Sequence, residues 1–306
     1  MKRKHTSKRI FAILLTICMV VSLMPIMSMT SLAAPTTTTY YVWVDDKQVT
    51  SDNKDDILND GGTASYDPSS QTLTLNGYNG GAIRADHALT VTLADGSENT
   101  VINPASNEAY CISANNNDLT INGSGDLKVI QNRYNCSAIA ADPDGGNLII
   151  DMAGDLNVTT YNWHGFYAYG SVTISGSGDV SICIEGKWNG TKGTGIVSGT
   201  EDVILSGSGK LTVDAQNAAC AVKLKASGKV LLLNGTGGPL SFSAGTYAAI
   251  VNQADKTSPV GGTNLAYYDK VTGAPNTASV VYDHTIIPIT TADASDINLP
   301  GMYGYG

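Results

Sequence analysis

The feature that most constrains the fold of this chain is an eleven-residue frame that recurs along it. In residues 119–129, two apolar alternations, Leu119/Ile121 and Leu127/Val129, flank a Gly-Ser-Gly-Asp turn. Alternation with a period of two predicts a strand with one buried face, and the glycines permit a sharp turn. Each frame therefore predicts a strand, a corner and a second strand. Further copies lie at 148–158, 172–182 and 203–213, and a looser copy, with one inserted residue, lies at 231–242.

A third strand completes the repeat. Short runs of small and β-branched residues lie between the frames, and one marker from each run recurs at steps of 29, 27, 28, 29, 26 and 28 residues. A near-constant period of this length indicates a solenoid, whereas a propeller blade needs about 40 residues. We therefore expect each repeat to be one coil of a parallel β-helix. The markers are Ile83, Ile112, Ile139, Tyr167, Ile196, Val222 and Ile250.

These repeats predict an all-β fold: a right-handed parallel β-helix of about six to seven coils, with three short strands in each coil. The helix is expected at residues 71–284, and residues 36–70 are expected to form an N-terminal β cap. Such a cap covers the core and the open strand edge of a solenoid's first coil. Trp43 and Ile57 are candidates for the side chains that cover the end of the core. Residues 285–306 are interpreted as a polar C-terminal tail, with an edge strand at 286–289 that tolerates Pro288.

Residues 1–34 predict a secretory signal peptide: a basic start, an apolar run from Ile10 to Met27, and small residues at Ser31 and Ala33. An uncleaved anchor is the alternative. Five of the 18 basic residues lie in this segment, so 13 basic residues face 27 acidic ones in the remainder, a net charge of −14. This charge argues against nucleic acid and anionic lipid as partners. We expect a secreted monomer without membrane contact after cleavage, and association with the cell surface remains open.

Four cysteines follow the signal segment, and none has metal-ligand spacing. Cys111, Cys136 and Cys220 lie in or beside the small-residue strand and are interpreted as small apolar residues of the interior. The alternative is a disulfide between Cys111 and Cys136, since neighbouring strands lie about 4.8 Å apart. The four are Cys111, Cys136, Cys183 and Cys220.

The repeat Leu-x-Ile-x-Gly-Ser-Gly-Asp-Leu-x-Val, with intervening Ala138-Ile139-Ala140, resembles secreted bacterial carbohydrate-binding β-helix domains. Those domains are similar to right-handed parallel β-helices of the pectate-lyase kind. The resemblance covers residues 40–282. It implies a protein that contacts an extracellular polysaccharide along one face of the solenoid, as an adhesin does.

The same resemblance leaves an enzyme open, because many such β-helices are polysaccharide lyases or glycoside hydrolases. Their Gly-His-Gly and Arg-x-Lys motifs do not occur after the signal segment, and Trp163-His164-Gly165 falls short of the first. Asp-Asp occurs only at residues 45–46 and 55–56, within the expected cap. We therefore expect a non-catalytic binding protein, with a lyase, a hydrolase or a structural surface protein as alternatives.

Aromatic residues recur seven or eight residues after the second strand begins in four of the five frames, and the frame at 203–213 breaks the series with Ala218. A ladder of aromatic faces suits the apolar faces of successive sugar rings, with Arg133 and His164 beside it to bond hydroxyls. The alternative is that the rings pack over one another and cover a corner of the solenoid. The ladder consists of Tyr134, Trp163, Trp188 and Tyr247, and Asn162, Lys187 and Asn189 also flank it.

Three aspartates hold the same place in successive frames: Asp126, Asp155 and Asp179. Carboxylates stacked about 4.8 Å apart repel one another. Either they belong to solvated Gly-Asp turns, or a calcium ion lies between them. No other cofactor is expected.

Overall fold

The computed structural model describes residues 36–103, 109–142, 145–185, 193–215, 218 and 220–224. It also describes the strands at 230–232, 240–244, 250–252, 277–282 and 285–290. All regular structure in these residues is β, and none of them belongs to a helix that could cross a membrane. The expected signal peptide, Trp188 and Tyr247 lie outside the described residues.

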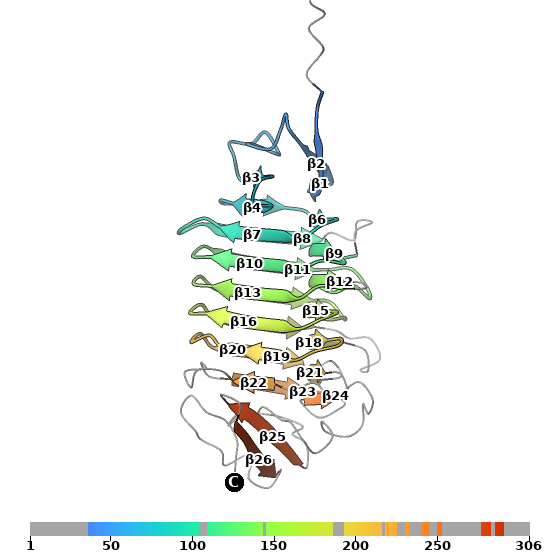
Figure 1. Ribbon diagram of the computed structural model, residues 1–306, viewed down its shortest axis with the longest axis vertical. Helices are drawn as coiled ribbons and strands as arrows, with labels where there is room; N and C mark the ends of the chain where they lie inside the picture. The colour runs from blue at the N-terminus through green and yellow to red at the C-terminus, as the bar shows by residue number, and fades with distance from the viewer. Residues whose placement is uncertain are drawn as a thin grey trace, which may run out of the picture. The chain divides into compact units, whose positions relative to one another are not determined.

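The strands form three sheets whose members succeed one another as rungs of a solenoid (Figure 1). In spatial order, sheet A contains β2 (Lys47–Thr50), β1 (Thr39–Val44), β6 (Ile83–Ala85), β9 (Ile112–Asn115), β12 (Ile139–Asp142), β15 (Phe166–Ala168), β18 (Thr194–Ser198), β21 (Cys220–Leu224) and β24 (Ile250–Asn252).

Sheet B contains β26 (Thr285–Thr290), β25 (Thr277–Tyr282), β22 (Val230–Leu232), β19 (Val203–Leu205), β16 (Val172–Gly176), β13 (Leu148–Met152), β10 (Leu119–Gly123), β7 (Leu89–Leu93), β4 (Thr72–Leu75) and β3 (Ala64–Asp67). Sheet C contains β23 (Leu240–Ala244), β20 (Leu211–Ala215), β17 (Val180–Ile184), β14 (Leu156–Thr160), β11 (Asp126–Gln131), β8 (Glu98–Asn103) and β5 (Asn79–Gly80).

The expected parallel solenoid is confirmed by the register between coils. Leu119 pairs with Leu89 on one side and with Leu148 on the other. The markers of sheet A also pair coil to coil, with one correction: the fourth marker is Phe166, which is fully buried, and not Tyr167, which is partly exposed. The resulting column is Ile83, Ile112, Ile139, Phe166, Ile196, Val222 and Ile250.

Glycines at the corner between sheets B and C let the coils approach closely. A Cβ atom on Gly154 would collide with the carbonyl oxygen of Gly125 one coil earlier, and a Cβ on Gly178 would collide with that of Gly154. Glycine is required here because any side chain would push the coils apart. The second glycine of the Gly-Ser-Gly turn is therefore a packing requirement as well as a turn residue.

The N-terminal segment departs from the parallel pattern. β1 pairs antiparallel with β2 and β6, and β3 pairs antiparallel with β4. Ile57 is fully buried, whereas Trp43 is partly exposed and carries the guanidinium of Arg84 over its ring.

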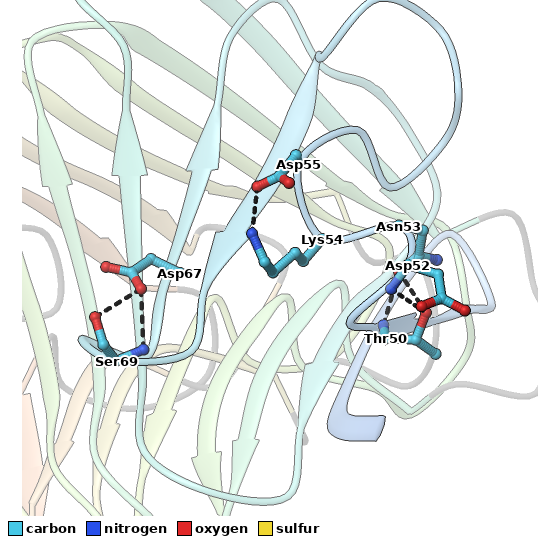
Figure 2. A network of polar contacts seen from close by, with 7 residues as sticks. All are labelled: Thr50, Asp52, Asn53, Lys54, Asp55, Asp67 and Ser69. Carbon is cyan, nitrogen blue, oxygen red and sulfur yellow. Dashed lines mark hydrogen bonds and ion pairs between the residues drawn. The ribbon is translucent and has the colours of Figure 1, made fainter. Parts of the chain in front are cut away.

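Polar contacts organise the acidic segment that follows β2. Lys54 bonds to Asp55 at 2.6 Å, and Asp67 accepts from the amide and hydroxyl of Ser69 at 2.9 and 2.7 Å (Figure 2). Both aspartates are exposed, as expected for a solvated region.

The thiols of Cys111, Cys136 and Cys183 are free, so the alternative of a Cys111–Cys136 disulfide is wrong. The reason is register: Ile112 pairs with Ile139, which places Cys111 opposite Ala138 rather than Cys136. The strand expected around Pro288 is confirmed as β26, at the edge of sheet B.

Candidate functional site

The candidate site lies at the corner between sheets C and A, on the loops that follow β11 and β14. Each strand ends in a buried polar residue that holds its loop from inside. The Gln131 side chain donates to the Ser137 carbonyl at 2.9 Å and accepts from the Arg133 amide at 2.9 Å. In the next coil, the Thr160 hydroxyl bonds the carbonyl and the amide of Trp163, at 3.1 and 3.3 Å. Because Gln131 and Thr160 are themselves buried, at 1% and 0% exposure, these bonds hold the loops in defined positions.

The two loops are also bonded to each other. The backbone amide of Asn135 donates to the side-chain oxygen of Asn162 at 3.0 Å, and Asn162 is only 6% exposed. This bond joins adjacent coils, so an aromatic group on one loop keeps its place relative to the other.

The exposed aromatic residues of this corner are Tyr134 and Tyr161, which are 38% and 43% exposed. Partial burial and the nearby Tyr161 raise the pKa of the Tyr134 phenol, so the hydroxyl stays neutral. Trp163 is partly exposed beside them. Two tyrosines and a partly exposed indole thus lie on two adjacent loops of this corner, where they offer aromatic faces and hydroxyl groups.

His164 lies beneath this surface. It is 6% exposed, with its ring 4.7 Å from that of Trp163 and 5.9 Å from the stacked ring of Tyr167. Burial, reinforced by the charge of Lys223, lowers its pKa to about 3 despite a hydrogen bond with the backbone of Thr194. The imidazole is therefore neutral, and in this arrangement it supports Trp163 from below.

Only two members of the predicted aromatic ladder lie in the described residues. Tyr134 and Trp163 occupy the same corner, and Arg133 is half-buried beside Tyr134. Tyr161 was not among the predicted residues, although it directly follows the buried Thr160 in an aromatic-rich run, which is the signal that could have found it. Trp188 and Tyr247 cannot be placed, because they fall outside the described residues.

The aspartate column lies at the other corner, between sheets B and C. All three side chains are exposed, and each carboxylate accepts from a backbone amide one coil further on. Asp126 accepts from Asp155 at 2.8 Å, Asp155 from Asp179 at 2.9 Å, and Asp179 from Lys210 at 2.8 Å. These bonds connect successive coils, 24 to 31 residues apart in the sequence, whereas a local Asp turn bonds the backbone about two residues on. Within the described residues, no group of three or more His, Cys, Asp or Glu side chains is arranged to hold a metal ion.

The fold thus defines an all-β parallel solenoid with a preorganised aromatic corner. No family model, curated protein or solved structure matches this chain.

Proposed function

We propose that this chain is a secreted, non-catalytic protein that binds an extracellular polysaccharide through the corner of Tyr134, Tyr161 and Trp163. The observation that carries the proposal is the pair of exposed tyrosines on adjacent coils, whose loops are bonded to each other through Asn135 and Asn162. Aromatic side chains offer large contact areas with few rotatable bonds, so their ordering costs little on binding. A polysaccharide presents apolar ring faces to such a surface and hydroxyls to its rim.

The same proposal includes the signal peptide, the N-terminal cap, and the handedness and number of coils of the solenoid. Residues 1–34 act as a signal peptide, and residues 36–70 cap the first coil. The solenoid is right-handed, as crossovers between parallel strands nearly always are, and it contains about six to seven coils. Calcium bound along Asp126, Asp155 and Asp179 is a separate hypothesis, since these carboxylates already accept backbone hydrogen bonds.

The test is retention of the protein on a panel of soluble and insoluble polysaccharides, with and without calcium. We expect retention on at least one neutral or charged glycan, weakened by about tenfold or more in the double variant Tyr134→Ala/Tyr161→Ala. Tyr169→Ala is the matched control, because Tyr169 is 39% exposed and lies on another corner.

Two outcomes count against this function. Retention that is equal in both variants would place the glycan elsewhere, and no retention on any glycan would remove carbohydrate binding altogether. New reducing ends or unsaturated products in the same incubations would favour the enzyme alternative.

A further inference from the structure

A second group of aromatic residues lies on β1, outside the corner described above. Tyr41 is 58% exposed and is the most exposed of the large hydrophobic side chains in the described residues. Its ring lies 6.5 Å from that of Trp43 in an edge-on arrangement. The guanidinium carbon of Arg84, on the neighbouring strand β6, lies 4.1 Å from the centre of the Trp43 ring.

The backbone of Tyr41 is unusual for a bulky residue. Its φ of 53° is in the left-handed region, and the pairing of β1 with β2 is irregular between Thr39 and Trp43. An aromatic residue is strained in this conformation, and strain of this kind persists where the surroundings hold it, often at binding sites. Irregular pairing of this kind re-aims a side chain. Here it accompanies a tyrosine that stands in solvent instead of packing.

Burial does not explain this arrangement. Val42 and Val44 on the same strand are fully buried, so β1 already contributes its inward face to the core. Tyr41 adds an exposed ring at a conformational cost that an asparagine or glycine would avoid. A tyrosine at this exposed and strained position therefore indicates that its ring contacts a ligand outside the chain.

We propose that Tyr41, Trp43 and Arg84 form a second glycan site that takes a neutral pyranose residue. The apolar face of the sugar would lie on the Tyr41 ring. The guanidinium of Arg84 lies over the Trp43 ring, and its terminal N–H groups would donate to sugar hydroxyls at the edge of this aromatic pair. A neutral sugar fits better than a polyanion, because residues 35–306 carry a net charge of −14.

This site does not depend on the corner site, although both would serve one polysaccharide. Two weak sites on one chain would bind a long glycan more tightly than either alone. The two proposals can therefore fail separately.

The test uses Trp43 as the reporter. In the variant Trp163→Phe/Trp188→Phe, Trp43 is the one remaining tryptophan of the sequence. Its fluorescence is titrated with linear gluco-, xylo- and manno-oligosaccharides and with an oligogalacturonate. We expect a saturable change with at least one neutral oligosaccharide, and about tenfold weaker binding after Tyr41→Asn.

The melting temperature separates binding from packing. Asparagine tolerates a positive φ, so Tyr41→Asn should leave the melting temperature unchanged or raised. The matched control, Tyr169→Asn, should leave the Trp43 titration unchanged, and so should Tyr134→Ala if the sites are independent. No response of Trp43 to any saccharide, a response to the acidic one alone, or a lower melting temperature with unchanged affinity would each overturn the proposal.

Discussion

Replacing Gly154 with alanine should destabilise the solenoid, although it adds a single methyl group at a corner. The new Cβ would lie 2.6 Å from the carbonyl carbon of Gly125 and 2.7 Å from the carbonyl oxygen of Ser124. An ordinary van der Waals contact begins at 3.4 Å. The neighbouring atoms are backbone, which cannot rotate away, and the Gly125 carbonyl oxygen lies closer still. The two coils must therefore separate locally by at least roughly 0.8 Å, the difference between 3.4 and 2.6 Å.

That separation breaks hydrogen bonds between the coils. The bond from the Asp155 amide to the Asp126 carboxylate is 2.8 Å long, and so is the bond from the Ala153 amide to the Gly123 carbonyl. Lengthened by that amount, both would reach about 3.6 Å, beyond a useful hydrogen bond. Two lost bonds at about 1 kcal/mol each, together with residual overpacking, give about 3 kcal/mol. For a domain of this size, this corresponds to a melting temperature lower by ~6–12 °C.

The assay is thermal unfolding followed by circular dichroism, with Gly145→Ala as the matched control. A Cβ on Gly145 has its closest neighbour, the Asn116 carbonyl oxygen, at 3.3 Å, and the backbone there is not left-handed. The control should melt within a few degrees of the parent. Equal melting of Gly154→Ala and the parent would refute the close stacking of these corners.

Three further perturbations follow from the same contacts. Burial, with Lys223, lowers the His164 pKa from 6.5 to about 3, so between these values the unfolded chain binds a proton that the folded chain does not. Stability should therefore fall below about pH 6.5, by at most ~1.4 kcal/mol per pH unit, and chemical unfolding of His164→Gln should show less of this loss. Burial raises the pKa of the Cys111 thiol to about 12, so alkylation at mildly basic pH should label Cys111 only after unfolding; labelling of the native protein would contradict its burial. Asp155→Ala should lower the melting temperature by removing the acceptor for the Asp179 amide, at about 1 kcal/mol, whereas Asp155→Asn should not; equal effects would show that the carboxylate charge matters more than the acceptor.

The period of the sequence was enough to predict the solenoid, because each coil must bury the same columns. It could not choose between Phe166 and Tyr167, since both neighbours in a three-residue strand are aromatic and only the pairing of Ile139 decides which one points inward. The period does identify the corner glycines as turn residues. Their role in close coil packing depends on the distance between the backbones of neighbouring coils, and the sequence of one repeat does not determine that distance.

The candidate site was harder to predict than the fold. Tyr134 and Trp163 were found by their recurrence after the second strand of the frame, but recurrence cannot tell an exposed ring from a buried one. His164 illustrates this: although it follows Trp163 in the sequence, it is buried, with its ring near those of Trp163 and Tyr167. Tyr41 could not be expected at all, because its exposure accompanies a backbone irregularity in β1.

The central claim is that a glycan lies against the corner formed by Tyr134, Tyr161 and Trp163. Hydroxyl-radical footprinting with a saturating glycan from the retention panel tests it most directly, because each aromatic side chain reports its own exposure. We expect oxidation of Tyr134 and Tyr161 to fall when the glycan is bound, while oxidation of Tyr169, which is exposed on another corner, stays the same. Unchanged oxidation of Tyr134 and Tyr161 in the saturated complex would contradict the claim.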